Sequence, residues 1–157
     1  MSVWYEITIK CWKLNESKIK KVKSSLRKFG FKIGEDNKKD GFDNVFDISM
    51  IIPLKEKVTE KNGEVYEKLD CDCTVGFHQD SIWFGRGCYF SSNLGLLKFE
   101  LLLVEIEKWI LKMFTVGTII RYGVECDLTA TGIVTKDKIE WVKTYVSAQN
   151  GDKTKLS

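Results

Sequence analysis

Proline is almost absent from this sequence, since Pro53 is the only one in 157 residues. A chain without proline-rich stretches shows no sign of a semi-rigid linker, and no other shift in composition marks a domain boundary. Histidine is equally scarce, with His78 alone, so catalysis that needs two histidines is excluded. A cysteine–histidine pair with Cys71, Cys73 or Cys88 is chemically possible, but a plain polar residue at a strand end is the commoner role for such a histidine.

The sequence also has no uninterrupted apolar run long enough to cross a membrane. Its longest apolar stretch, residues 94–114, contains three lysines and three glutamates. The first residues, Met-Ser-Val-Trp-Tyr-Glu, do not have the basic and apolar regions of a secretory signal. The five cysteines are an odd number, which fits reduced thiols better than a set of disulfides. We therefore expect a cytoplasmic protein.

The cysteines give little support for a metal site. Cys71 and Cys73 alternate along a predicted strand and do not follow the Cys-x2–4-Cys spacing of zinc sites. Cys11 and Cys126 would have to join them from other strands, and cysteines at alternating apolar positions usually act as small hydrophobic residues. The acidic stretch 36–47 misses the calcium-loop pattern, because a lysine occupies its third position. We expect no metal and no cofactor.

The residues that are present suffice for a folded domain. Apolar residues make up 43% of the chain and aromatic residues 12%, which excludes global disorder. The net charge of +3 is unevenly distributed. Residues 15–30 carry six basic side chains against Glu16 alone, which gives +5 there and leaves about −2 for the remainder. Charge alone does not indicate a nucleic-acid partner.

Hydrophobic periodicity divides the chain into elements. Apolar residues at every second position predict strands, whereas a spacing of three to four residues predicts helices. Asn15 is a suitable N-cap and Gly30 a suitable C-terminal stop for the first helix. Pro53, which cannot donate to a ladder, indicates a sheet edge. The patterns predict strands over 3–12, 46–54, 65–77 and 116–128, and helices over 15–30, 93–114 and 136–148. They predict a loop over 32–44 and either a loop or a loop with a short strand over 80–90.

The order β-α-β-β-α-β predicts a ferredoxin-like α+β fold, an antiparallel sheet with two helices on one face, followed here by an appended C-terminal helix. We expect one domain over residues 1–148 and a disordered tail over 149–157. The long helix 93–114 is apolar around most of its circumference. Its second face therefore needs cover from the terminal helix, from the 80–92 loop or from a second chain, which leaves a homodimer possible.

In this fold the first and third strands are central, and their outward residues combine aromatic rings with carboxylates. RNA-binding domains stack bases on such rings, but the excess of carboxylates would repel phosphates, so nucleic acid is unlikely there. The face suits a basic protein surface, although a solvated face explains the same residues equally well. The candidate partner-binding residues are Trp4, Glu6, Trp12, Tyr66, Asp70, Asp72, Arg121, Glu125 and Asp127.

The segment 82–90 gathers aromatic residues around two glycines and one arginine. Its spacing fits neither the dinucleotide fingerprint nor a phosphate-binding loop. A flexible loop with this composition resembles a binding hot spot, while a loop that folds its aromatic residues into the core is the alternative. The candidate residues of this segment are Trp83, Phe84, Arg86 and Tyr89.

Three functions remain open. The residues favour a non-enzymatic protein-binding or inhibitor domain, comparable to toxin-immunity and phage counter-defence proteins, that engages a basic target through its acidic face. The second is a small-molecule or nucleotide binder, or a hydrolase without a recognisable motif, with a pocket near the 80–92 loop. The third is weak nucleic-acid binding through the basic helix 15–30, whose lysines would read no base sequence. Because no catalytic constellation is recognisable, we expect no enzyme.

Overall fold

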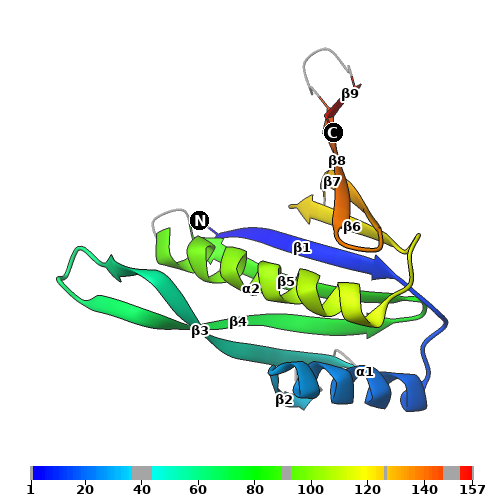
Figure 1. Cartoon of the computed structure of the whole chain (residues 1–157), viewed down its shortest axis with the longest axis horizontal. Helices are drawn as coiled ribbons and strands as arrows, with labels where there is room; N and C mark the ends of the chain where they lie inside the picture. Colours follow the sequence, from blue (N-terminus) through cyan, green and yellow to red (C-terminus); the bar gives the residue numbers. More distant parts are fainter. Residues whose placement is uncertain (1, 37–43, 90–92, 126, 147–152, 157) are drawn as a thin grey trace.

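The structure is a computed structural model that describes residues 2–36, 44–89, 93–125, 127–146 and 153–156. Within these ranges, strands form a single antiparallel sheet and two helices pack on one of its faces (Figure 1). The elements are β1 Ser2–Lys10, α1 Glu16–Phe29, β2 Lys32–Asp36, β3 Val45–Thr59, β4 Val65–His78, β5 Ser81–Tyr89, α2 Asn93–Met113, β6 Ile119–Val124, β7 Asp127–Val134, β8 Ile139–Val146 and β9 Lys153–Leu156. The nine strands follow the order β2-β3-β4-β5-β1-β6-β7-β8-β9 across the sheet.

The first strand and the first helix form as their sequence patterns predict. The side-chain oxygen of Asn15 accepts a hydrogen bond from the backbone N–H of Lys18 at 2.9 Å, which satisfies one free donor at the helix start. Gly30 ends the helix with a φ of 122°, a conformation that favours glycine. The apolar stripe faces the sheet, and the buried residues of α1 are Ile19, Val22 and Leu26.

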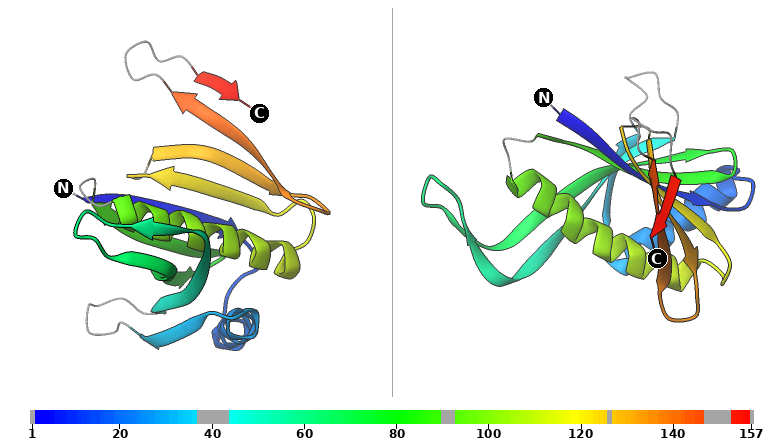
Figure 2. Two further views of the ribbon diagram at one scale, coloured as in Figure 1. Left: turned by 60° about the vertical axis from the view of Figure 1, so that its left-hand side comes forward. Right: turned by 90° about the horizontal axis from the view of Figure 1, so that it is seen from above.

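The core lies between the sheet and α2. Trp109 of α2 packs edge-on against Phe84 of β5, with 5.8 Å between the ring centroids. Its indole N–H donates to the hydroxyl of Ser25 on α1 at 3.0 Å, so the same residue joins the two helices. Burying a large apolar side chain of this kind contributes about 1.5–3 kcal/mol. Both helices lie on one face of the sheet (Figure 2), and we call the opposite face the outer face.

The ferredoxin-like prediction is wrong, because the sheet has a different strand order. That fold would place the strand 65–77 next to the strand 3–12. In the structure β5 lies between them and is antiparallel to both β4 and β1. β5 and β6 lie on either side of β1, and both run antiparallel to it. The chain passes from β5 to β6 through α2, which crosses β1. The sheet also continues through β7, β8 and β9.

The predicted loop over 80–90 is instead the strand β5. Its glycines, which suggested a loop, allow aromatic rings to lie directly over the strands. A Cβ atom on Gly85 would lie 2.3 Å from the ring of Trp4, and one on Gly76 of β4 would lie 2.1 Å from the ring of Trp83. A glycine inside a strand commonly marks such a close approach.

The predicted C-terminal helix over 136–148 is also wrong, because its residues form β8. Ile139 and Val142 fit a helical spacing, but a short apolar run is ambiguous between the two periods. β-branched and aromatic residues dominate this run, which favours a strand against the free edge of β7. Trp141 lies over Gly132 of β7, where a Cβ atom would be 2.9 Å from the ring. Lys153–Leu156, inside the expected tail, pairs with β8 as β9.

The predicted strand over 116–128 is divided into β6 and β7. The two strands pair antiparallel, with Val124 opposite Asp127, so the turn between them is very short. Glu125 in this turn has a φ of 52°, a left-handed conformation that non-glycine residues seldom adopt. Pro53 lies beyond the last pair of β2 with β3, at Lys32 and Ser49, as expected for a residue that cannot donate to a ladder.

Candidate functional site

The outer face carries a row of small and polar residues across four neighbouring strands. Thr74 of β4 pairs with Gly85 of β5, Gly85 pairs with Glu6 of β1, and Glu6 pairs with Gly123 of β6. Glycine has no side chain, so Glu6 stands between two gaps. The ring of Trp4 fills the gap at Gly85. The gap at Gly123 forms part of a shallow hollow.

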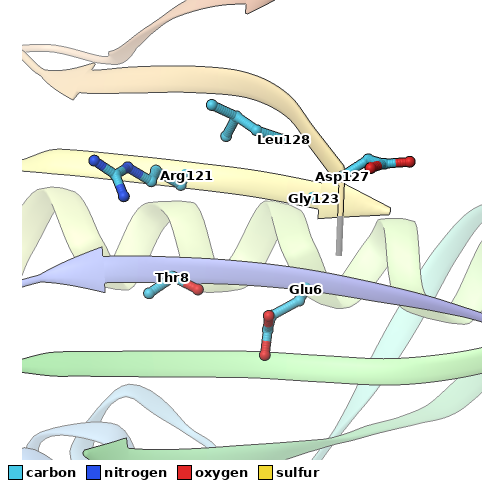
Figure 3. Close-up of a pocket in the computed structure, with 6 residues that line it drawn as sticks. All are labelled: Glu6, Thr8, Arg121, Gly123, Asp127 and Leu128. Carbon is cyan, nitrogen blue, oxygen red and sulfur yellow. The ribbon is translucent and has the colours of Figure 1, made fainter. Parts of the chain in front are cut away.

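The hollow has a volume of about 240 Å³ and lies over β1, β6 and the start of β7. In Figure 3 the carboxylate of Glu6 points toward β5, the guanidinium of Arg121 extends along β6, and Asp127 points away from both. Among the described residues no ion pair joins these three groups. The charges therefore surround the hollow without converging on one reacting atom. The lining residues are Glu6, Thr8, Arg121, Gly123, Asp127 and Leu128.

Two tryptophans cover the glycines of the strands on the β5 side of Glu6, Trp4 over Gly85 and Trp83 over Gly76. Trp4 and Trp83 contact each other edge-on, with 6.3 Å between their ring centroids. Burial raises the pKa of Glu6, and a hydrogen bond from the Trp4 side chain partly opposes this rise. The backbone of Trp4 holds the β6–β7 turn, because its N–H donates to Glu125 Oε1 at 3.1 Å and its carbonyl accepts from the Glu125 N–H at 2.8 Å. Trp4, Glu6 and Glu125 thus form one connected group.

An apolar patch lies on β6 and β7 beside the hollow. Ile119 pairs with Ile133 across the two strands, and Leu128 pairs with Gly123. Ile119, Leu128 and Ile133 are 43%, 45% and 45% exposed, respectively. Single exposed apolar residues are common on any surface, but a cluster next to polar groups is typical of an interaction site.

Asp70 and Asp72 lie on β4, separated from β1 by β5. Asp72 forms an ion pair with Arg86, whose Nη1 atom also donates to the Asp72 carbonyl at 2.6 Å. Arg86 therefore ties β5 to β4 beyond their last ladder pair, at Thr74 and Gly85. The negative charge of Asp72 is offset within the chain, whereas Asp70 has no ion pair among the described residues.

The structure does not bring Trp12 and Tyr66 to the hollow. Trp12 lies past the end of β1 and stacks on Phe114, with 5.3 Å between centroids and 17° between the ring planes. It lines a second hollow, of about 410 Å³, beside the C-terminal end of α2. Tyr66 lies near the β3–β4 turn, where its hydroxyl donates to Glu64. Trp12 lies outside the strand, and Tyr66 packs against the core although the alternation of side chains predicted that it faces outward.

The four candidates from the predicted loop have different environments within β5. Phe84 is fully buried against Trp109, as in the alternative that folds its aromatic residues into the core. Trp83 lies on the outer face, and Arg86 binds Asp72. Tyr89 belongs to β5, but its side chain lies outside the described part of the structure. Neither hollow described above is lined by residues 80–92.

The described cysteines are free thiols, at Cys11, Cys71, Cys73 and Cys88, and Cys126 lies outside the described residues. Burial raises the pKa of both Cys11 and Cys71 to about 11, which keeps these thiols protonated. Within the described ranges no group of three or more His, Cys, Asp or Glu side chains is placed to hold a metal ion. No helix among the described residues combines the length and apolar character needed to span a membrane.

Sequence reasoning did not single out Thr8, Gly123 and Leu128 as site residues. Thr8 alternates with Trp4 and Glu6, so its outward direction was visible in the sequence. In a single strand over 116–128, Leu128 would point to the same side as Ile120 and away from Arg121. The β6–β7 turn and the register shift after Tyr122 place Leu128 opposite Gly123 instead.

The chain matches no protein-family model, and no curated protein and no solved structure is significantly similar to it. The geometry of the described residues is therefore the basis for the proposals that follow.

Proposed function

We propose that this chain is a protein-binding domain of the inhibitor type, which engages a basic surface of another protein through its outer face. The observation that carries this proposal is that the outer face exposes an apolar patch beside the carboxylates of Glu6 and Asp127. Both helices cover the opposite face (Figure 2). Glu6, Asp70 and Asp127 form no ion pair in the described part of the chain, so their charges are available to a partner.

The two kinds of residue would have different roles in such an interface. Burial of Ile119, Leu128 and Ile133 would supply affinity, at roughly 25 cal/mol per Å² of apolar surface removed from water. The carboxylates would attract a basic surface and raise the association rate. Arg121 places a positive charge among these carboxylates. It would repel a basic group of a partner bound in the wrong position and would therefore favour one binding position.

Weak nucleic-acid binding through α1 is a second candidate. Lys20, Lys21 and Lys28 are exposed on this helix, so their ammonium groups can reach phosphates. Lys23 is committed elsewhere, since its Nζ atom lies 3.9 Å from the ring centroid of Phe46. Binding of this kind would be independent of sequence and would weaken steeply with salt.

The proposal is tested by comparative affinity capture from the cells in which the protein is made, with nuclease present throughout. The baits are the wild-type chain, the double variant Asp70→Lys/Asp127→Lys, and the control Asp137→Lys in the β7–β8 turn. We expect a protein with a basic surface that the wild type and the control retain and the double variant loses. Equal retention by all three baits would place the interface away from the outer face. Binding that disappears on nuclease treatment would favour α1.

A further inference from the structure

α2 has a second apolar stripe on the side away from the sheet. Toward the sheet it buries Phe99, Ile106 and Ile110. On the other side Val104 is 50% exposed, and the leucines beside it are only partly buried at the margin of the core. We call this second stripe the α2 seam. It consists of Leu94, Leu97, Leu101, Val104, Lys108 and Leu111.

The chain does not cover the α2 seam with either segment that the sequence suggested. The expected terminal helix is the strand β8, and the expected 80–92 loop is largely β5, inside the sheet. β8 reaches α2 at its flank, where Trp141 hydrogen-bonds Glu107. Figure 1 shows no described segment passing in front of α2.

The residues of the α2 seam follow the spacing of a coiled coil. Successive members are separated by three, four, three, four and three residues, which is the heptad alternation of a and d positions. Five of the six are aliphatic. Lys108 is the exception and occupies an a position, where a single polar residue favours pairing of two helices in one register.

From this spacing and the charges beside it, we propose that the α2 seam pairs antiparallel with the same seam of a second copy of this chain. In that arrangement Lys98 of one copy faces Glu105 of the other, and two-fold symmetry makes this contact twice. Lys108, whose Nζ atom lies 3.3 Å from the Glu105 carboxylate of its own chain, also lies beside Glu100 of the other copy. A parallel pair would instead place Glu100 against Glu105, which is repulsive. Its attractive pair, Lys112 with Glu107, would rely on a carboxylate that already accepts a hydrogen bond from Trp141.

The antiparallel pair brings Glu100 of one copy toward Glu107 of the other. This contact is tolerable because Glu107 is directed to Trp141 and is partly buried, which raises its pKa. The helix layers of the two copies then lie inside and the two sheets outside. The dimer presents two outer faces in opposite directions, which allows bivalent binding. The inference is independent of the proposed function, because a different surface carries it.

Sedimentation at micromolar concentration tests the dimer directly. We expect the wild type at twice the 18.1 kDa mass of the chain. Val104→Glu should return it to a single 18.1 kDa species. Val116→Glu is the matched control, because Val116 is 69% exposed but lies outside the α2 seam, and it should remain dimeric. Circular dichroism confirms that each variant is folded. A monomeric wild type, or a folded Val104→Glu variant that stays dimeric, would overturn the proposal.

Charge exchange tests the antiparallel orientation. Glu105→Lys should weaken the dimer by at least roughly tenfold, because it removes two contacts with Lys98. Adding Lys98→Glu should restore it. In a parallel dimer Glu105→Lys would instead strengthen association, since the new lysine would face Glu100, and that result would contradict the antiparallel pairing.

Discussion

At the scale of single residues, Glu6 lies at the centre of the candidate site in an environment that disfavours its charged form. Burial raises its pKa above the ordinary value of 4.5, so the ionised form is disfavoured in the folded chain. A raised carboxyl pKa gives a contribution to stability that is fully present below the unfolded pKa and is lost as the pH rises through the folded pKa.

Glu6→Gln should therefore be more stable than the wild type at neutral pH, because the amide removes the buried charge and keeps the shape. The gain should shrink as the pH falls from the raised pKa of the folded state toward 4.5 and should be lost below it, where both states of the wild type are protonated. Urea unfolding at pH 7 and pH 4 measures the difference, with Asp137→Asn as an exposed control. A loss of stability in Glu6→Gln at pH 7 would contradict this account of Glu6.

Cys11 should react slowly although it is only half-buried. Burial raises its pKa from an ordinary value of 9.0 to about 11, with the Asp80 carboxylate adding to the rise. The thiolate is the reactive form, so modification at pH 8 should be roughly 100-fold slower than for an unperturbed thiol. Timed labelling with a thiol reagent, followed by mass spectrometry of the peptides, checks this. Labelling of Cys11 at the rate of a free thiol would show that its environment is misassigned.

Among the site residues, the sequence correctly predicted those whose position depends only on local alternation. Trp4 and Glu6 point outward from β1, and Arg121 points outward from β6 to line the same hollow. Trp12 lies past the end of β1 and Tyr66 lies at the far end of β4, because alternation shows neither where a strand ends nor what lies beside it. That information depends on which strands are neighbours, and those contacts join residues far apart in the chain.

At the scale of elements, glycine and tryptophan act together across strands of the outer face. Gly85→Ala should destabilise the chain by about 1–3 kcal/mol, because its Cβ atom would lie 2.3 Å from the ring of Trp4. In a Trp4→Ala background the same change should be nearly neutral, which a double-mutant cycle in urea measures. Gly34→Ala is the control, since its Cβ atom would make only an ordinary contact of 3.5 Å. An equal loss of stability in both backgrounds would show that the Trp4 ring is not the reason why position 85 needs glycine.

The elements with complete local signals were predicted well, and those with ambiguous signals were not. α1 has a cap at each end and an unbroken apolar stripe, and the structure confirms it. β5 contains Gly85, which the ring of Trp4 on β1 requires, so the residues of β5 alone suggest a loop. The short apolar run of β8 fits both the helical and the strand spacing of apolar residues. Only its pairing with the free edge of β7 makes it a strand.

At the scale of the whole molecule, strand order is the feature that the sequence could not supply. β1 finds its neighbours β5 and β6 more than seventy residues away, and no local pattern encodes this pairing. The resulting sheet leaves one face without helices, which is why the outer face became the candidate interface. The proposed antiparallel pairing of the α2 seam would leave that face open in the dimer.

Binding of a basic partner by the acidic outer face should be visible in the association kinetics with the captured protein. Asp70→Lys/Asp127→Lys should lower the association rate constant roughly tenfold or more at low ionic strength, with a smaller change in the dissociation rate constant. The difference should narrow as salt is added, and Asp137→Lys should behave like the wild type. Equal association rates for the wild type and the double variant at low ionic strength would contradict the claim.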